Sequence, residues 1–250
     1  MKQRKSLKFK ILIGLVVLLL IAVSGFLLFV SSSYEAQSLA LENLKSDNQV
    51  TVEQNGDILF KPVSNAKDTG YVFYPGAKVE PAAYAPMAKE ITSKGYTVVI
   101  AKIPFNLAIL SPNKADAIIK KYPAIDRWVI GGHSLGGVMA SDYVLKNDKV
   151  KGLILLASYP QAKTDLSTET IEVLSMWGSN DEVADVEKIK NAKNVMPSDA
   201  VFIELTGGNH AGFGDYGHQK GDGEATISNE QQLMETSSHS IELLDRVNEN

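Results

Sequence analysis

The most informative part of this 250-residue chain is residues 127–137, which read Arg-Trp-Val-Ile-Gly-Gly-His-Ser-Leu-Gly-Gly. The stretch opens with an apolar run, Trp128–Ile130, and a helical pattern begins at Leu135, so we predict a strand, a tight turn and a helix. The turn holds the pattern G-x-S-x-G, with Ser134 between Gly132 and Gly136. A serine there occupies a strained turn, and glycines two residues away on either side remove a steric collision. Ser134 is therefore a candidate nucleophile.

Two plainer interpretations compete with a nucleophile at this turn. One is a glycine-rich loop that cradles a phosphate, and the other is an ordinary tight turn. The stretch lacks the Gly-Lys-Ser/Thr ending of a nucleotide-binding loop, and its glycine spacing is not that of a dinucleotide fingerprint. The nucleophile is the interpretation that we favour.

Strand and helix patterns alternate on both sides of this turn. Continuous apolar strands separated by amphipathic helices predict an α/β fold, with a mainly parallel sheet covered by helices on both faces. Asn55-Gly56 predicts an antiparallel hairpin at the N-terminal end of the sheet. We expect strands at 49–53, 57–63, 71–74, 97–103, 127–130, 150–157, 171–177 and 201–205, and helices at 80–94, 113–122, 135–146, 183–192 and from Ser228 onward.

A serine hydroxyl needs a base, and the base needs a group that orients it. His210 follows the strand at 201–205 after a short flexible turn, and Asp181 follows the strand at 171–177. The carboxyl ends of parallel strands share one edge of a sheet, so Ser134, Asp181 and His210 are expected to meet there. The order Ser, Asp, His along the chain is typical of this architecture.

Other residues compete for these roles. His133 is expected to point across the turn as a packed or hydrogen-bonded residue, His218 lies in a glycine-rich loop, and His239 falls on a solvated helix face. Glu182 and Asp185 are close to Asp181, but they fall at or inside the next helix, where acidic residues commonly serve the helix N-terminus.

An oxyanion formed at Ser134 requires two backbone donors. The N–H of Leu135, directly after the nucleophile, is one candidate. The loop 75–78 follows the strand at 71–74, and we favour the N–H of Ala77 as the second donor. An ordinary turn at Pro75-Gly76 is the alternative.

Four motifs follow one another in order along the chain: Phe73-Tyr-Pro-Gly-Ala77, Gly132-His-Ser-Leu-Gly-Gly137, Gly178-Ser-Asn-Asp181 and Gly207-Gly-Asn-His210. With these motifs, the chain from about Tyr71 to Leu244 resembles the α/β-hydrolase superfamily, and it is most similar to the compact branch that includes dienelactone-hydrolase-like proteins. This resemblance implies a Ser134–Asp181–His210 triad and hydrolysis through an acyl-serine. Dienelactone hydrolases use a cysteine, which this chain lacks, and Tyr74-Pro75 stands where many relatives have His-Gly.

The predicted substrate pocket is shallow and open. Only about a dozen residues separate the strands at 150–157 and 171–177, too few for a cap domain. Side chains in edge loops are candidates for lining the pocket, and core packing is an equally good interpretation of the aromatic ones. The candidates are Phe105, Asn106, Leu107, Tyr159, Phe213 and Tyr216.

The loop 211–227 contains five glycines and is long enough to act as a flap over His210. Its charged and histidine residues raise the question of a metal site, but solvated loop charges are the better interpretation. These residues are Asp215, His218, Asp222 and Glu224. We expect no metal and no other cofactor.

The N-terminus predicts a membrane segment. Five cations and no anion lie in residues 1–10, and an uncharged apolar run follows from Ile11 to Val30. Twenty helical residues span about 30 Å, the thickness of a bilayer core, and cations on the near side indicate a cytoplasmic N-terminus. We favour an uncleaved signal anchor over a signal peptide cut near Ser31 and Ser33. The expected layout is 1–10 cytoplasmic, 11–30 transmembrane, 31–48 stalk or linker, and 49–250 an extracytoplasmic catalytic domain, or a secreted one after cleavage.

Composition excludes several classes of protein. The chain has no cysteine, which excludes disulfides, zinc-thiolate sites and a cysteine nucleophile. Beyond residue 30, 20 cations face 29 anions, a net charge of −9 that argues against nucleic-acid partners.

The sequence therefore predicts a membrane-anchored serine esterase that acts on a small-molecule or polymer-linked ester. An acyltransferase with the same triad is one alternative. A catalytically silent scaffold of the same fold is another, and peptidase activity is a weaker one.

Overall fold

The computed structural model describes residues 2–249, with side chains from Lys8 onward, as two compact units that divide between Ser33 and Tyr34. The first unit is helix α1 (Lys2–Ser31). Within it, the 24 residues Lys8–Ser31 are long and apolar enough to cross a membrane. The predicted apolar N-terminal helix is therefore present.

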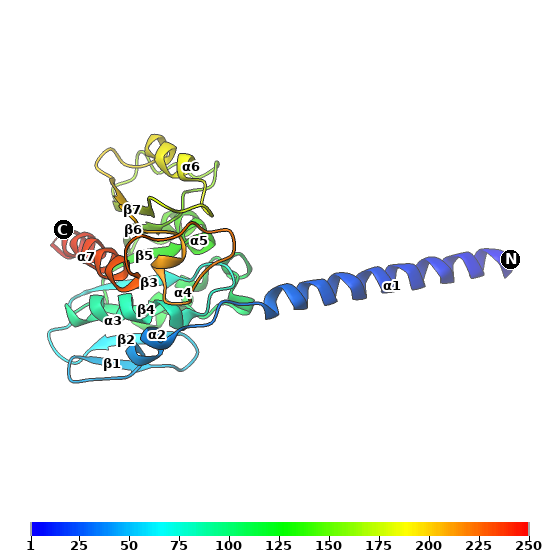
Figure 1. Ribbon diagram of the computed structural model, residues 1–250, viewed down its shortest axis with the longest axis horizontal. Helices are drawn as coiled ribbons and strands as arrows, with labels where there is room; N and C mark the ends of the chain where they lie inside the picture. Colours follow the sequence, from blue (N-terminus) through cyan, green and yellow to red (C-terminus); the bar gives the residue numbers. More distant parts are fainter. Residues whose placement is uncertain (1, 250) are drawn as a thin grey trace. The chain divides into compact units, whose positions relative to one another are not determined.

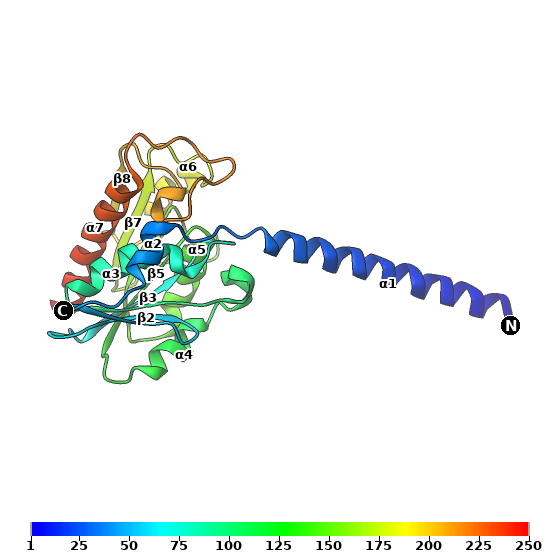
Figure 2. The ribbon, with the colours of Figure 1, turned by 60° about the horizontal axis from the view of Figure 1, so that its bottom comes forward.

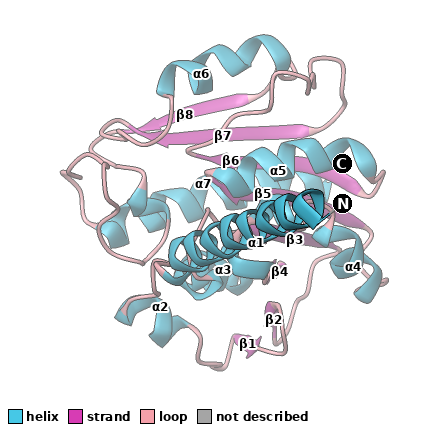
Figure 3. Cartoon of the chain, turned by 90° about the vertical axis from the view of Figure 1, so that its right-hand side faces the viewer, coloured by secondary structure: helices cyan, strands magenta, loops and turns pink. Residues whose placement is uncertain are grey.

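The second unit is built on an eight-stranded sheet with the order β1-β2-β4-β3-β5-β6-β7-β8 (Figures 1 and 3). The strands from β4 to β8 in this order are parallel, and β1 and β2 form an antiparallel hairpin that joins the sheet through β4. This confirms the predicted fold class. The strands are β1 (Val50–Glu53), β2 (Ile58–Pro62), β3 (Thr69–Tyr74), β4 (Thr97–Ile100), β5 (Arg127–His133), β6 (Val150–Leu156), β7 (Glu172–Gly178) and β8 (Val201–Leu205).

Both faces of the sheet are covered because the strands are apolar on both sides. In β3, Tyr71 and Phe73 pack into the core under α3 and α7, whereas Val72 and Tyr74 pack into the core under α4 and α5 (Figure 2). The helices of this unit are α2 (Ser38–Asn43), α3 (Ala85–Ser93), α4 (Lys114–Lys121), α5 (Leu135–Tyr143), α6 (Val186–Asn191) and α7 (Asn229–Glu249).

Two local features differ from the predicted elements. Helix α6 begins three residues later than expected, since the N–H groups of Val183 and Ala184 bind the Asp181 carboxylate instead of entering a helix. Of residues 31–48, which the sequence predicts to form a stalk or linker, Tyr34 and Leu39 pack against the core of the second unit. The described stretch 157–171, between β6 and β7, contains no helix, so the site lacks a cap domain as predicted.

Strand β3 is the switch point of the sheet. The chain passes from β3 to β4 on one side and then returns to β5 on the other. In open α/β sheets, ligands bind in the crevice outside the carboxyl ends of strands at such a point. The loops after β3 and β5 are those that contain Ala77 and Ser134.

The first turn of α5 packs directly on the end of β3. A methyl group placed on Gly136 would lie 2.1 Å from the carbonyl oxygen of Tyr74 and 2.5 Å from that of Pro75. Only a residue without a Cβ allows this approach.

We expect Gly136→Ala to destabilise the protein by about 1–3 kcal/mol, because the new methyl group meets backbone that has no room to move. Alanine normally stabilises a helix interior relative to glycine, so the expected sign is the reverse of the intrinsic helix propensity. Thermal unfolding of the purified full chain measures the effect. The matched control is Gly152→Ala in β6, whose methyl group would meet three side-chain carbons at 3.1 Å. A melting temperature for Gly136→Ala at or above that of the control contradicts the prediction.

Candidate active site

Ser134 occupies the turn between β5 and α5, as the sequence predicts, with φ 51° and ψ −123°. A positive φ is uncommon for a residue other than glycine, so the turn is strained. Its backbone N–H donates to the carbonyl oxygen of Leu156 (2.9 Å), and its carbonyl oxygen accepts from the Ser158 hydroxyl (2.8 Å). The end of β6 and the residues after it therefore hold the strained turn, and they leave the half-buried Ser134 side chain at the sheet edge.

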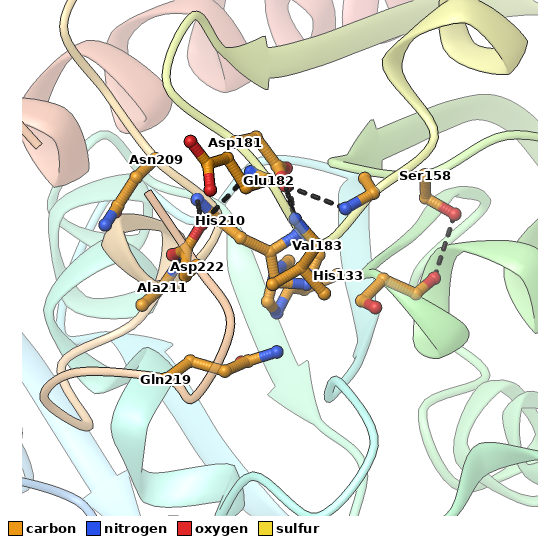
Figure 4. Close-up of polar contacts among 12 residues, drawn as sticks. His133, Ser158, Asp181, Glu182, Val183, Asn209, His210, Ala211, Gln219 and Asp222 are labelled. Atoms are coloured by element: carbon orange, nitrogen blue, oxygen red, sulfur yellow. Dashed lines mark hydrogen bonds and ion pairs between the residues drawn. The ribbon is translucent and has the colours of Figure 1, made fainter. Parts of the chain in front are cut away.

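The imidazole of His210 and the carboxylate of Asp181 form a buried pair. Nδ1 of His210 lies 2.9 Å from Oδ2 of Asp181, and both side chains are almost entirely excluded from solvent (Figure 4). The other carboxylate oxygen accepts from the N–H groups of Val183 and Ala184, at 2.9 and 2.8 Å. A carboxylate held in this way can accept a proton from Nδ1 of His210, and Nε2 is the ring nitrogen that takes no part in the pair.

The competing acids and histidines do not take part in this pair. Glu182 is exposed, and Asp185 accepts from the N–H of Lys188 (3.1 Å) at the start of α6. His218 is exposed, and His239 lies 3.1 Å from the carboxylate of Glu242 on α7.

His133 connects the turn to both neighbouring loops. Its ring packs against that of His210, with centroids 4.5 Å apart (Figure 4). Its Nδ1 lies 2.9 Å from the Tyr84 hydroxyl, which accepts from the N–H of Gly76 at 3.0 Å. Because that hydroxyl still has its own proton to donate, Tyr84 can donate to Nδ1, which places the ring proton on Nε2, a buried atom with no hydrogen-bond partner among the described residues. Burial, and then the neighbouring His210, hold the pKa of His133 well below 6.5, so this ring is neutral.

The structure brings Ser134 and His210 to one sheet edge without a hydrogen bond between them. Among residues 2–249, no hydrogen bond joins the Ser134 hydroxyl to the imidazole. The two residues are linked through His133, which precedes Ser134 in the chain and contacts the His210 ring. Catalytic hydrogen bonds are often long in ligand-free proteins and shorten when substrate binds.

The two expected oxyanion donors are not occupied by hydrogen bonds within the described residues. The backbone N–H groups of Leu135 and Ala77 donate to no protein acceptor within the described residues, and both residues are half-buried. The contact of Gly136 with Tyr74 and Pro75 brings the segments that contain these donors together.

A second carboxylate, Asp222, holds the loop that contains His210. This residue is buried, and its Oδ1 accepts from the N–H groups of His210 (3.2 Å) and Gly223 (2.9 Å). Its Oδ2 accepts from the N–H of Ala211 at 2.8 Å. The expectation of a solvated loop charge is wrong for Asp222, because these buried N–H groups require an acceptor. One sequence signal indicates this role: Asp222 lies between two glycines, and the N–H groups of glycines can approach a carboxylate closely.

The amide of Gln232 on α7 holds the same loop from the other side. Its Oε1 accepts from the N–H of Asn209 (3.1 Å), and its Nε2 donates to the carbonyl of Asn209 (2.8 Å). Farther along the loop, the N–H of Asp215 donates to the carbonyl of Ala83 at 2.8 Å. The N–H of Thr226 donates to the carbonyl of Gly207, also at 2.8 Å. The loop 211–227, which the sequence predicts as a candidate flap, is thus hydrogen-bonded at several points along its length.

The candidate pocket residues occupy different environments. Phe105 is exposed, whereas Asn106 and Tyr159 are half-buried. Tyr159 borders a cavity of about 340 Å³ together with Pro160, Lys188 and Val195. Phe213 has no exposed surface and packs on His133, with ring centroids 5.8 Å apart, so it supports the site from the core instead of lining a pocket.

Comparisons with known proteins agree with this architecture. Residues 70–234 match the model of the alpha/beta hydrolase family. The structure is similar to the esterase domain of a Rhodothermus marinus protein, with a TM-score of 0.60 and 12% identity over 80% of this chain and 98% of that one. It is also similar to a predicted CIB-like hydrolase from Thermoplasma acidophilum, with a TM-score of 0.55 and 18% identity over 78% and 98% of the two chains. No curated protein matches the sequence.

Asp222→Asn is expected to loosen the His210 loop. The amide nitrogen of asparagine cannot accept from a backbone N–H, so one buried donor loses its partner, at a cost of about 1–3 kcal/mol. Hydrogen exchange followed by mass spectrometry should report exchange about tenfold faster, or more, for the peptide that contains His210 and Ala211. Glu224→Gln, at an exposed position of the same loop, is the control and should leave exchange unchanged. Equal protection in both variants would show that Asp222 does not hold the loop.

The buried neutral state of His133 predicts a pH-dependent stability. Because its pKa is lowered in the folded protein, unfolding exposes a ring that takes up a proton below about pH 6.5. Its contribution to stability is present above pH 6.5 and is lost as the pH falls from 6.5 toward the folded-state pKa. Between pH 7.5 and 5.5, the unfolding free energy of the wild type should therefore fall more steeply than that of His133→Gln, by at most about 1.4 kcal/mol per pH unit. Parallel curves from chemical denaturation would contradict a neutral His133.

Proposed function

The chain belongs to the alpha/beta hydrolase family, and on that basis we propose that it is a serine hydrolase that cleaves carboxylic esters through an acyl-serine intermediate. Ser134 is the nucleophile, His210 the general base and Asp181 the group that orients the base. The observation that carries the proposal is the buried Asp181–His210 pair at the same sheet edge as the strained Ser134 turn.

In the proposed acylation, the Ser134 hydroxyl oxygen attacks the ester carbonyl carbon and its proton passes to Nε2 of His210. Asp181 stabilises the resulting imidazolium through the Nδ1 proton. The C–O bond of the tetrahedral intermediate then breaks, and His210 returns the proton to the departing alkoxide. The alcohol leaves and the acyl group remains on Ser134.

The negative charge of the tetrahedral intermediate requires donors that are already in place. The N–H groups of Leu135 and Ala77 supply them in this proposal, and their lack of protein acceptors supports the role. Leu135 is at the N-terminus of α5, where the helix dipole adds to the stabilisation of an anion. One such donor accounts for about 10²–10³ in rate in comparable sites.

Deacylation repeats these steps with water as the attacking group. His210 takes a proton from the water molecule, the hydroxide oxygen bonds to the acyl carbon, and the proton returns to Ser134 as the acyl–serine bond breaks. The products are a carboxylic acid, an alcohol and the regenerated hydroxyl. With no cap helix between β6 and β7, the site suits a small acyl group or an ester on a large substrate.

We also propose that the enzyme is a single-pass membrane protein whose catalytic domain is extracytoplasmic. The length and apolar character of Lys8–Ser31 support a membrane segment. The cations before this segment support a cytoplasmic N-terminus.

A fluorophosphonate probe tests the nucleophile, because it reacts covalently with an activated serine. The wild type should be labelled and should hydrolyse short p-nitrophenyl esters. Ser134→Ala should lose the label and several orders of magnitude of turnover. Ser167→Ala, at an exposed position outside the site, is the matched control and should keep both. A wild type that neither reacts with the probe nor turns over esters would exclude the proposed activity and indicate a binding protein.

A further inference from the structure

The chain enters the catalytic unit beside the proposed active site. The N–H of Tyr34 donates to the carbonyl of Lys78 (2.7 Å), and the carbonyl of Tyr34 accepts from the N–H of Glu80 (3.0 Å). Lys78 directly follows Ala77, the proposed oxyanion donor. The first residues of this unit are therefore bound to one of the loops that form the site.

The same segment is also bound to the loop that follows His210. The N–H of Gln37 donates to the carbonyl of Asp215 (2.8 Å), and the N–H of Ala40 donates to its carboxylate (2.7 Å). The rings of Tyr34 and Tyr216 lie 5.6 Å apart. Both loops beside the site are thus attached to the residues that follow the apolar helix.

The connection between the apolar helix and this attachment point is short. Helix α1 ends at Ser31, three residues before Tyr34. Three residues span at most about 11 Å, whatever the orientation of the catalytic unit. If α1 crosses a membrane, the surface of that membrane therefore lies close to the loops around the site.

An exposed apolar loop lies at this same edge. Of the nine large apolar side chains that are exposed in the described residues 34–249, three lie within residues 105–110. Phe105, Ile109 and Leu110 are 50%, 58% and 48% exposed. We call residues 105–110 the apolar loop. The loop follows β4 at the carboxyl edge, and its Asn106 carbonyl accepts from the N–H of Lys78 at 2.8 Å. Lys78 therefore joins the apolar loop to the segment that comes from the apolar helix.

The backbone of the apolar loop is held in a defined conformation. Phe105 and Asn106 both have positive φ values, 55° and 53°. Two consecutive residues other than glycine adopt this region only when their surroundings impose it. The apolar side chains are therefore presented by a shaped loop.

Resting on the function proposed above, we propose that the apolar loop lies in the surface of the membrane that α1 crosses, and that the enzyme hydrolyses esters of lipids in that membrane. Single exposed apolar residues are common, but several on one loop beside an open site mark an interaction surface. The short connection selects the bilayer as the partner. Apolar side chains that enter the headgroup boundary reach the depth at which lipid ester groups lie.

Two esters with one fluorescent leaving group test this substrate class. The full chain is reconstituted in phosphatidylcholine vesicles and given methylumbelliferyl oleate, which resides in the bilayer, or methylumbelliferyl acetate, which is water-soluble. The double variant Ile109→Asp, Leu110→Asp should cleave the oleate at least tenfold more slowly than the wild type does, and the acetate within twofold. Leu145→Asp is the matched control: Leu145 has the same 48% exposure as Leu110 but lies before β6, at the opposite sheet edge. It should leave both rates unchanged.

A second measurement locates the loop without relying on activity. The chain contains no cysteine, so Leu110→Cys and Leu145→Cys each carry a polarity-sensitive fluorophore at one site. In phosphatidylcholine vesicles, the fluorophore at position 110 should show a blue-shifted emission, and that at position 145 should remain water-like.

The outcomes separate the two proposals. Equal oleate rates in the wild type and the double variant, or a water-like signal at position 110 in vesicles without other proteins, would overturn the membrane contact and point to a protein partner for the loop. A wild type that cleaves neither ester would instead overturn the proposed esterase activity. The fluorescence result would then still decide whether the loop meets the bilayer.

Discussion

The close packing of the first turn of α5 on the carbonyls of Tyr74 and Pro75 is the constraint on which the rest of the site depends. This approach brings the loop after β3 against the turn after β5, so the segments that contain Ala77 and Leu135 lie together. In the same loop, Gly76 donates its N–H to the Tyr84 hydroxyl, which is hydrogen-bonded to His133. One contact between backbones thus places Ser134, the proposed nucleophile, beside the loop that contains a proposed oxyanion donor.

His210, the proposed base, is positioned by a separate set of buried polar groups. Asp181 binds the imidazole, whereas Asp222 and Gln232 bind the backbone of the residues around it. Buried carboxylate and amide groups are costly unless they are fully hydrogen-bonded, and here they satisfy backbone N–H groups that no helix or strand could satisfy. This explains why a loop so rich in glycine adopts one conformation around His210.

Much of the fold could be predicted from the sequence, because its signals are local. Asn55-Gly56 predicts the hairpin, the apolar runs predict the buried strands, and the glycines around Ser134 predict the strand–turn–helix. The predicted positions of Asp181 and His210 followed from the rule that functional groups gather at the carboxyl ends of parallel strands. What could not be predicted depends on contacts between distant residues. The glycines beside Asp222 do not indicate that this carboxylate binds Ala211, and Phe213 is an aromatic residue in an edge loop, typical of a pocket, although it packs in the core.

The attachment of Tyr34 to Lys78 has a consequence for a severed form of the protein. A protease that cut the chain between Ser33 and Tyr34 would remove the apolar helix, but the hydrogen bonds of Tyr34, Gln37 and Ala40 with the two loops would all remain. The shed fragment would keep the geometry around Ser134 and lose the helix that we propose crosses the membrane. Proteolysis at this junction would then change where the protein is held and leave the proposed triad intact.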